Sequence, residues 1–370
     1  MNISKLKLVN FRNYDKLNIS LGTNMNVFIG TNAQGKTNIL EAINFLALTK
    51  SHRTSNEEDL IRIGCSKSIV NGRIRNEGIL KQLEISLNSG NKILKINETK
   101  IKRVSEYISN LIVISFTPDD LEIIKSSPSI RRNVLNIQIS QLSKTYLNTY
   151  NQYNKLLKTR NEYLKILFIN NLADQKYFDI ITDKLIEKAV IIYKLRKEYI
   201  DKINENIGHI YGDIACSEDN IYLKYEPNVL FSDYNEECIR DVLIKTYRKN
   251  YKKELNNGMT LFGPHRDDFS FYISEKNLKL FGSQGQQKLA IVAYKLAEIN
   301  IFKEKCQTTP VLLLDDIFSE LDIKKRNRLL KYIKDGIQSI ITTTDLKNIQ
   351  KKYLENACIF EVSNGEIIRK

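Results

Sequence analysis

The segment GTNAQGKT at residues 30–37 constrains the fold of this chain more than any other feature. It fits the pattern G-x-x-x-x-G-K-[ST] at every fixed position, and it lies between an apolar run, NVFI, and a run with helical periodicity, TNILEAINFLAL. A loop of this pattern binds phosphate when it follows a strand and opens a helix. The segment therefore predicts a phosphate-binding loop carried by an α/β sheet.

The residue types in this loop suit that chemistry. Gly30 and Gly35 let the backbone curl so that its N–H groups converge on phosphate oxygens, and the helix that follows adds a partial positive charge. Lys36 is predicted to reach the β- and γ-phosphates, and the Thr37 hydroxyl is predicted to ligate Mg²⁺. The predicted nucleotide-binding residues are consecutive: Gly30, Thr31, Asn32, Ala33, Gln34, Gly35, Lys36 and Thr37.

A second apolar run, VLLLDD at 311–316, ends in two acids. It places Asp315 at the carboxyl end of a buried strand, which is where ligands bind in an open parallel sheet. By themselves, two acids at a strand end fit a solvated turn better. Together with the phosphate loop, they predict that Asp315 lies on the Mg²⁺ side of the site and that Asp316 orients the attacking water. The predicted catalytic residues are Lys36, Asp315 and Asp316, and the predicted Mg²⁺ ligands are Thr37 and Asp315.

The charge of the chain suggests a polyanionic partner. Lys and Arg number 57 against 43 Asp and Glu, which gives a net charge of +14, and such an excess is typical of nucleic-acid-binding proteins. The chain is also rich in Lys, Asn and Ile, so a compositional bias would produce the same excess. There is no Trp, and no aromatic cluster resembles a stacking platform, so base-specific recognition is not indicated.

Three absences in the sequence bear on its location. No apolar run approaches 18 residues, so no membrane span is expected. The N-terminal segment MNISKLKLVNFRNY alternates like a strand and has no apolar signal core. The five cysteines are scattered and odd in number, which argues against a disulfide framework or a zinc site. We therefore expect a cytoplasmic protein.

The hydrophobic pattern changes twice along the chain. Residues 1–115 read mostly as strands with one helix over 36–48 and an apolar strand at 111–116. Apolar residues then recur at helical steps over 131–170 and over 181–203, which predicts two long antiparallel helices. Strands and short helices are expected after about residue 220, including helix 286–302, strand 311–316, a helix from 326 that Gly336 stops, and strand 339–345.

This order predicts an α/β fold with mixed sheets and an inserted helical lobe or arm. The head is expected to comprise residues 1–125 and 250–370. The lobe, with short strands of its own, is expected over residues 126–249.

The succession of motifs resembles ABC-type ATPases of the SMC-like branch: a phosphate loop, a long insertion, then SQGQQ, LLLDD and SELD. Further blocks resemble the RecF family of recombination-repair proteins, in the same order and with similar spacing. These are NFRNY (10–14), KSHRT (50–54), FTPDDLEIIKSSPSIRR (116–132), TRNEYLK (159–165), GPHRDD (263–268), GSQGQQKLA (282–290), LLLDDIFSELD (312–322) and ITTTD (341–345). Their joint occurrence along the whole chain is far more specific than the phosphate loop alone.

The resemblance implies an ABC-type head that binds ATP and Mg²⁺, dimerises around ATP, binds single- or double-stranded DNA without sequence preference, and hydrolyses ATP slowly. It also implies RecO- and RecR-like partners and a role in loading recombinase onto gapped DNA, with no membrane partner. By this resemblance Ser283, Gly285 and Gln286 belong to a signature segment that caps the ATP of the other subunit. Asp322 belongs to the loop after the acids.

Some positions depart from the family pattern. TRNEYLK lacks the usual leading glutamine, Lys288 stands where arginine is common, and Asn136 stands where Asp is expected. Thr344 falls near the place where many transporter ATPases carry a histidine. Asp316 stands where those ATPases usually have Glu, and its shorter side chain predicts slow turnover.

Other polar residues leave two interpretations open. For His265 in GPHRDD, a structural role is favoured over a metal site. KSHR at 50–53 fits a phosphate or DNA contact about as well as a solvated loop. Arg131 and Arg132 fit a phosphate or acidic partner as well as a helix-start surface. The tyrosines of helix 131–170 are expected in the core rather than at a nucleic acid.

Three other functions are compatible with a phosphate loop. A transporter ATPase subunit would have a much shorter insertion before its signature than the ~250 residues here. A P-loop kinase needs neither the signature segment nor SELD. A large SMC protein needs a longer insertion to form its coil and hinge.

Overall fold

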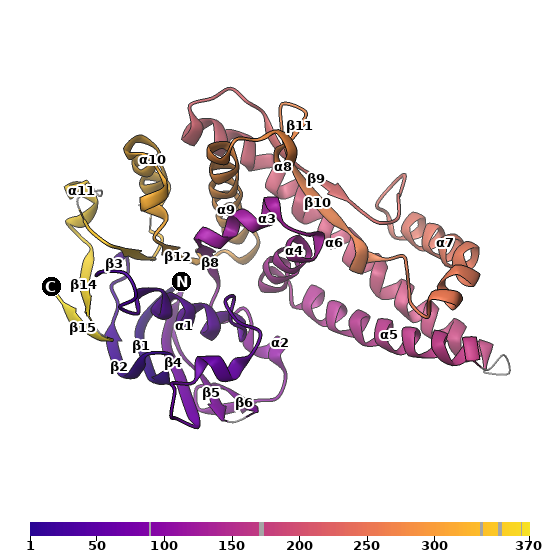
Figure 1. The fold of residues 1–370 in the computed structure, drawn as a ribbon, viewed down its shortest axis with the longest axis horizontal. Coiled ribbons are helices and arrows are strands. Elements are labelled where there is room, and N and C mark those ends of the chain that lie inside the picture. The colour runs from indigo at the N-terminus through magenta and orange to yellow at the C-terminus, as the bar shows by residue number, and fades with distance from the viewer. Residues whose placement is uncertain (89, 170–173, 334–335, 347–349, 364) are drawn as a thin grey trace. The chain divides into compact units, whose positions relative to one another are not determined.

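The computed structural model describes residues 1–88, 90–169, 174–333, 336–346, 350–363 and 365–370. These residues form two compact units that interleave along the sequence (Figure 1). Unit 1 comprises Met1–Leu121, His209–Glu218 and Lys288–Lys370, and unit 2 comprises Glu122–Gly208 and Asp219–Gln287.

Unit 1 contains an antiparallel sheet in the order β2-β1-β4-β5-β6-β7. Its strands are β1 (Asn2–Phe11), β2 (Tyr14–Ser20), β4 (Lys67–Asn76), β5 (Ile79–Asn88), β6 (Asn91–Ile96) and β7 (Thr99–Ile101). The register of β1 on β4 shifts between Ile3 and Lys5. Because strand side chains alternate between faces, this irregularity lets Ile3 and Leu6, three residues apart, both lie in the core.

A second sheet in unit 1 has the order β15-β14-β3-β13-β12-β8. Its strands are β3 (Met25–Ile29), β8 (Val113–Phe116), β12 (Val311–Asp315), β13 (Ser339–Thr343), β14 (Cys358–Ser363) and β15 (Glu366–Arg369). All pairings are parallel except that of β14 with β15. The carboxyl ends of β3, β12 and β13 therefore meet at one edge, and the loops that follow them share that edge.

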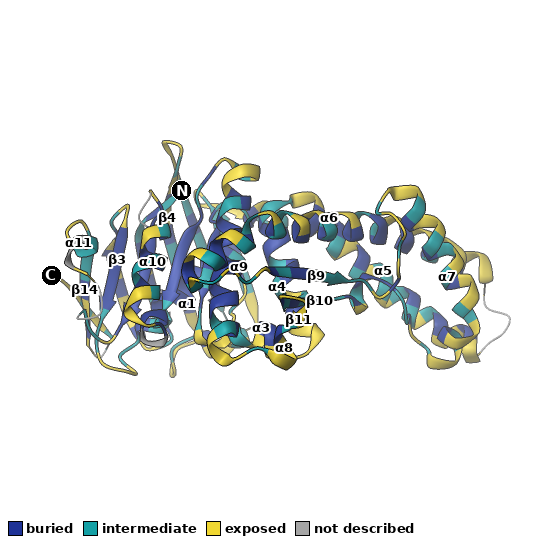
Figure 2. Cartoon of the chain, turned by 90° about the horizontal axis from the view of Figure 1, so that it is seen from above, coloured by how far each residue is buried: buried dark blue, intermediate teal, exposed yellow. Residues whose placement is uncertain are grey.

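Helix α1 (Lys36–Leu48) packs into the core formed by both sheets. Its apolar residues share one cluster with Leu6 and Val70 of the antiparallel sheet and with Phe28 and Leu313 of the parallel sheet. Most of α1 and β3 is accordingly dark blue in Figure 2. A helix covered on both sides must be apolar nearly all round, as NILEAINFLAL is, and Glu41 is the charged exception within that run.

The rest of unit 1 consists of short helices and helical turns around these sheets. They are η1 (Glu57–Leu60), α2 (Val104–Tyr107), η2 (Pro118–Leu121), η4 (Ile317–Glu320), α10 (Ile323–Ile333) and α11 (Lys351–Leu354). Helix α9 (Gln284–Cys306) belongs to unit 1 from Lys288 onward. The helix expected from 326 is α10, but residues 334–335, just before Gly336, lie outside the described ranges.

Unit 2 is built from long helices and a small antiparallel sheet. The helices are α3 (Glu122–Lys125), α4 (Pro128–Leu142), α5 (Lys144–Ile169), α6 (Gln175–Ala215, to Gly208 in this unit), α7 (Glu236–Asn257) and α8 (Leu278–Phe281). The turn η3 (Pro264–Arg266) precedes the sheet β11-β10-β9, formed by β9 (Ile221–Glu226), β10 (Asp268–Ile273) and β11 (Lys276–Asn277). Arg160 of α5 is fully buried against Glu254 of α7, with 2.7 Å between the charged atoms.

The prediction of one helix over 131–170 is wrong, because α4 and α5 are separate. Ser143 between them is extended, with φ −140° and ψ 110°. Its Oγ accepts a hydrogen bond from Tyr146 N at 3.1 Å, which caps the start of α5. Buried residues recur at helical steps on both sides of the break, which is why the periodicity alone did not locate it.

The predicted strands and short helices after residue 220 did not include α7, which runs for 22 residues. Its sequence is highly charged, and its buried residues are only Ile239, Leu243, Tyr247 and Glu254. Because so few residues of α7 are buried, its sequence shows little of the hydrophobic periodicity expected of a helix. Helix α7 packs with α5, and β10 pairs with β9, so unit 2 continues beyond the boundary expected at 249/250 and ends at Gln287.

Two further observations concern the chain as a whole. Each helix in the described ranges is too short or too polar to cross a lipid bilayer. All five cysteines fall within these ranges and are free thiols.

Candidate functional site

The loop Gly30–Thr37 connects β3 to α1 at the carboxyl edge of the parallel sheet. At Gly30, a Cβ atom would lie 2.3 Å from the carbonyl oxygen of Val362, so no side chain fits there. Gly35 has φ +105°, a backbone conformation that side chains rarely adopt. The two fixed glycines of the motif therefore serve two needs, close approach at Gly30 and left-handed backbone at Gly35.

The side chain of Lys36 folds back over this loop. Its Nζ donates to the carbonyl oxygens of Gly30 at 2.7 Å and Thr31 at 2.8 Å. Burial lowers the pKa of Lys36, and the carboxylates of Asp316 and Asp315 oppose that effect. The ammonium group is thus held inside the curve of the loop, where a phosphate would sit.

The phosphate loop and the strand-end acid meet through Thr37. Its Oγ1 donates to Asp315 Oδ1 at 3.0 Å. Thr342 of the neighbouring strand β13 donates to the same oxygen at 2.7 Å. Thr342 was not predicted, although it lies beside Asp315 in the parallel register and within the block ITTTD; a polar residue at the end of the adjacent strand was the signal available.

Asp316 follows in a left-handed conformation, with φ +48°. Its backbone N–H donates to Thr342 Oγ1 at 3.0 Å, so Thr342 holds both acids. A non-glycine residue with positive φ is strained, and such residues concentrate at functional sites.

The oxygen atoms at this edge fit Mg²⁺ together with a phosphate ligand. No cluster of three or more His, Cys, Asp or Glu side chains within the described ranges would hold a metal by itself. Thr37 Oγ1 and Asp315 Oδ1 are hard oxygen donors, and Mg²⁺ in nucleotide sites takes one or two protein oxygens, with phosphate oxygens and water as the rest. The predicted ligands thus fit the predicted ion.

The turn between β1 and β2 supports the phosphate loop from outside. Asn13 Nδ2 donates to the carbonyl oxygen of Gln34 at 3.4 Å, and Tyr14 Oη donates to that of Gly35 at 3.1 Å. These residues belong to the block NFRNY, for which the sequence gave no role. Their contacts indicate that this block helps to hold the phosphate loop in its conformation.

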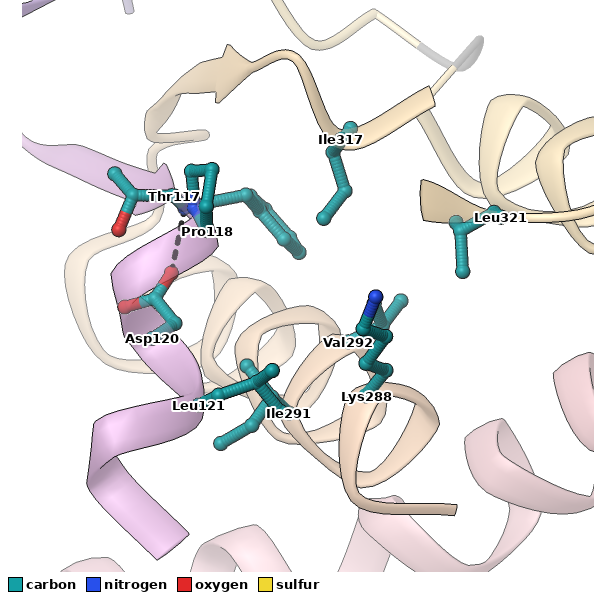
Figure 3. A pocket seen from close by; sticks show the side chains of 10 residues that line it. Thr117, Pro118, Asp120, Leu121, Lys288, Ile291, Val292, Ile317 and Leu321 are labelled. Carbon is teal, nitrogen blue, oxygen red and sulfur yellow. Dashed lines mark hydrogen bonds between the residues drawn. The ribbon is translucent and has the colours of Figure 1, made fainter. Parts of the chain in front are cut away.

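The block FTPDD contacts α9 behind the acids. Lys295 of α9 is buried and pairs with Asp120 at 3.2 Å, and Asp120 Oδ2 accepts a hydrogen bond from Thr117 N at 2.7 Å (Figure 3). Beside them is an apolar cavity of about 20 Å³, room for about one water molecule. Its lining includes residues from this turn, from α9 and from the segment after Asp316: Phe116, Thr117, Pro118, Asp120, Leu121, Lys288, Ile291, Val292, Ile317 and Leu321.

The segment GSQGQQ lies in unit 2 at the start of α9. Ser283 Oγ accepts from Gln286 N at 3.2 Å, and Gln286 Oε1 accepts from Ser283 N at 3.0 Å. This reciprocal pair is a capping box. It leaves the hydroxyl hydrogen of Ser283 and the amide hydrogens of Gln286 able to donate outward from an exposed helix N-terminus.

Gly285 lies in the same turn, and neither its backbone conformation nor its neighbours among the described residues require glycine there. Its φ is not positive, and a Cβ added there would meet no atom of the described residues closer than Ser283 Oγ at 3.9 Å. Gly285 is itself exposed.

The remaining predicted positions have more local contacts. Asp322 Oδ1 accepts from Lys325 N at 3.0 Å at the start of α10, and its pKa is lowered by its backbone and side-chain hydrogen bonds to Lys325. Thr344 is exposed beyond β13. The side chains of Ser319 and Glu320, in SELD, lie outside the described part of the chain.

Comparison with known proteins identifies the family. The sequence profile described as "RecF/RecN/SMC N terminal domain" matches residues 2–367. The "DNA replication and repair protein RecF" of Lactobacillus gasseri is 39% identical, with 100% of each chain covered. The protein of the same description in Listeria monocytogenes is 37% identical over 99% of each chain. The chain belongs to the RecF family of DNA replication and repair proteins.

Solved structures agree with this assignment. A RecF structure described as "the recombination mediator protein RecF-ATP in RecFOR pathway" is 31% identical, covers 100% of this chain and 99% of its own, and superposes with a TM-score of 0.92. An Smc head bound to the C-winged helix domain of ScpA superposes with a TM-score of 0.57 at 17% identity, which shows a shared fold. The expected α/β head of RecF and SMC type is confirmed.

Several RecF blocks turn out to support unit 2. Two interpretations were left open for Arg131, a phosphate or acidic partner and a helix-start surface. In the structure Arg131 is buried and pairs with Asp268 of the same chain through a contact of 2.6 Å. Asn136, which replaces the expected Asp, accepts hydrogen bonds from Tyr146 Oη at 2.6 Å and Arg196 Nη2 at 2.8 Å. Arg196 also pairs with Asp267 at 2.8 Å, and that carboxylate supplies the negative charge in this buried cluster.

Proposed function

We propose that this RecF-family chain is an ATP- and Mg²⁺-dependent DNA-binding switch that acts in DNA replication and recombinational gap repair. One observation carries the proposal: the 3.0 Å hydrogen bond from Thr37 Oγ1 to Asp315 Oδ1 joins the phosphate loop and the strand-end acid in one site. Its relatives support it, since one solved RecF structure is described as "RecF-ATP" and as a recombination mediator.

In this proposal, residues Gly30–Thr37 hold the phosphates, and Lys36 moves its ammonium group from loop carbonyls to phosphate oxygens. Thr37 and Asp315 would hold Mg²⁺, which offsets the negative charge of the phosphates. Asp316 orients the water that attacks the γ-phosphate. Its short side chain reaches less far than Glu, so turnover is slow, which suits a switch rather than a motor.

The signature segment is proposed to meet the ATP of a second copy of this chain. Ser283 and Gln286 offer donors at an exposed helix N-terminus, where negative charge is favoured. Glycine at 285 is not explained by contacts within the described chain, but close approach of a phosphate to the backbone would explain it. Asp322 is proposed to lie at the same interface.

The partners of the switch follow from the family and the charge. We propose sequence-independent binding of single- or double-stranded DNA, and RecO- and RecR-like partners that help load recombinase onto gapped DNA in the cytoplasm. A solved relative is described as part of the RecFOR pathway. The net charge of +14 favours a polyanionic partner.

The test is the mass of the protein in solution as a function of ATP. Multi-angle light scattering of the Asp316→Asn variant, which retains ATP longer, should show a monomer without nucleotide and a dimer with ATP and Mg²⁺. Removing Mg²⁺ with EDTA should weaken this shift. The Ser283→Arg change should abolish the dimer while leaving nucleotide binding intact.

The matched control is Ser274→Arg, which adds the same charge at another exposed serine of unit 2. This variant should still dimerise. If Ser283→Arg instead abolishes nucleotide binding by the monomer, the segment does not act across the dimer. If wild-type protein fails to bind ATP, the whole proposal is wrong.

A further inference from the structure

Glu41 is a fully buried carboxylate one helical turn after Thr37, in an otherwise apolar stretch of α1. Arg12 reaches it with two nitrogens, Nε to Oε2 at 2.9 Å and Nη2 to Oε1 at 2.7 Å. Arg53 Nη1 reaches Oε2 at 3.1 Å, and Ser51 Oγ donates to Oε1 at 2.6 Å. Both carboxylate oxygens are therefore saturated by charged or hydroxyl donors.

The first arginine connects Glu41 to the phosphate loop through the β1–β2 turn. The side chain of Arg12 is 21% exposed while that of Glu41 is 0% exposed, so the arginine reaches inward to the acid. Arg12 has φ +53° in this turn. The next two residues, Asn13 and Tyr14, donate to the carbonyl oxygens of Gln34 and Gly35. Fixing Arg12 thus fixes the residues that hold the loop backbone.

The second arginine reaches the same turn along α1. Arg53 Nη1 donates to Asn38 Oδ1 at 2.9 Å, and Asn38 Nδ2 donates to Asn13 Oδ1 at 2.8 Å. Asn13 Nδ2 then donates to Gln34 O. Two routes therefore start at Glu41 and end on the backbone of the phosphate loop. One runs through Arg12 and the covalent chain to Asn13 and Tyr14, and the other runs through hydrogen bonds from Arg53.

Stability alone does not account for a carboxylate at this position. A buried ion pair is often no more stabilising than apolar side chains of similar volume, because desolvation offsets the attraction. The flanking residues of the same helix, Ile39, Leu40, Ala42 and Ile43, are all apolar and buried. The charge of Glu41 is instead explained by Arg12 and Arg53, which it binds and which support the residues packed on the outside of the phosphate loop.

We infer that Glu41 is a positioning residue of the nucleotide site, which holds Arg12 and Arg53 so that Asn13, Asn38 and Tyr14 keep the phosphate loop in its binding shape. The inference rests on the proposed function, because it requires that the loop binds a nucleotide. Glu41 itself need not touch the nucleotide. Its effect is to reduce the rearrangement that the loop would otherwise undergo on binding.

The test is the affinity for a fluorescent ATP analogue with Mg²⁺, measured by equilibrium titration at a temperature where circular dichroism shows every variant folded. Glu41→Gln keeps the size of the side chain but cannot neutralise two guanidinium groups. It should raise Kd about tenfold, equivalent to about 1.4 kcal/mol. In an Arg12→Gln, Arg53→Gln background, the same change should alter Kd at most about twofold, because the groups that it acts through are gone.

Glu84→Gln is the matched control, since Glu84 pairs with Lys95 at 2.9 Å on the antiparallel sheet of the same unit. It should leave Kd unchanged. If Glu41→Gln does not fold, Arg53→Gln carries the test, because Arg53 is 40% exposed and should tolerate replacement; it should also raise Kd.

The possible failures are distinguishable. If the wild-type protein does not bind the nucleotide, the proposed function fails. If the wild type binds but Glu41→Gln or Arg53→Gln binds equally well, only the positioning role is wrong. An equal effect of Glu41→Gln in both backgrounds would also overturn it, since that effect would not pass through the arginines.

Discussion

His265 of unit 2 is held in its neutral form by hydrogen bonds at both ring nitrogens. Its Nδ1 lies 2.7 Å from Tyr153 Oη, and its Nε2 lies 3.1 Å from the carbonyl oxygen of Thr260. A carbonyl only accepts, so Nε2 carries the hydrogen and Nδ1 accepts from the tyrosine. Burial lowers the pKa of His265 to about 4. The predicted structural role agrees with these contacts.

This geometry predicts a pH dependence of stability. The unfolded chain binds a proton at His265 near the ordinary pKa of 6.5, whereas the folded chain does so only near 4. Stability should therefore fall as the pH drops from about 6.5 towards 4, by at most about 1.4 kcal/mol per pH unit from this group. Urea denaturation at several pH values would measure it, with His265→Gln flattening the slope in that window.

The control for this prediction is His209→Gln, because the side chain of His209 is 79% exposed. It should leave the slope as in the wild type. Identical slopes for His265→Gln and the wild type would show that His265 is not the titrating group.

At the scale of elements, the turn FTPDD is joined to α9 by a buried charge pair. Lys295 is nearly inaccessible, and burial would lower its pKa, but Asp120 and Glu298 hold the pKa above its usual value. The pair joins the turn after β8 to the helix that begins with the signature segment. Its loss would remove the ion-pair partner of the buried ammonium group and leave only Glu298 to offset its desolvation.

Asp120→Asn should therefore lower the free energy of unfolding by up to about 3 to 5 kcal/mol, the cost of leaving a buried charge with no partner; Glu298 should keep the loss below that limit. Chemical denaturation followed by circular dichroism would measure the change. Glu236→Gln breaks the exposed pair with Lys194 and should cost less than about 1 kcal/mol. Equal effects of the two variants would show that the pair between Asp120 and Lys295 stabilises the fold no more than an exposed ion pair does.

Elements with strong periodicity could be predicted from the sequence, and those with weak periodicity could not. The expected helix over 36–48 matches α1 at both ends, because a strand, a glycine loop and an apolar helix follow one another without ambiguity. The charged helix α7 was missed because few of its residues are buried. The break at Ser143 was missed because its cap is a local hydrogen bond that leaves the hydrophobic pattern unchanged.

The same distinction applies to the site. Thr37 and Asp315, which the sequence placed at one site from two separate motifs, lie within hydrogen-bond distance of each other, and their roles towards Mg²⁺ stay predictions. Thr342 and Glu41 were missed because their roles depend on which strands and side chains are neighbours. Those neighbours are set by sheet order and by long-range packing, which a single sequence does not reveal.

At the scale of the whole molecule, the excess of positive charge bears on the proposed binding of DNA. A net charge of +14 attracts a polyanion of any sequence, and binding through phosphates releases counterions from the nucleic acid. No aromatic platform was predicted from the sequence, so stacking on bases is not expected to dominate the binding. Affinity should therefore depend on salt more than on sequence.

The salt dependence of DNA affinity measures how many phosphates the protein contacts. With ATP present, affinity for a duplex with a single-stranded gap should fall about a thousandfold between 50 and 200 mM salt if about six phosphates are contacted. Fluorescence anisotropy with two unrelated sequences of equal length would measure it, and both should give the same slope of log Kd against log salt. The comparison must be made at fixed ATP, because the proposed ATP-dependent dimer would carry twice the charge of one chain. Affinity that is unchanged over this range, or binding that is absent with ATP, would contradict an electrostatic DNA contact.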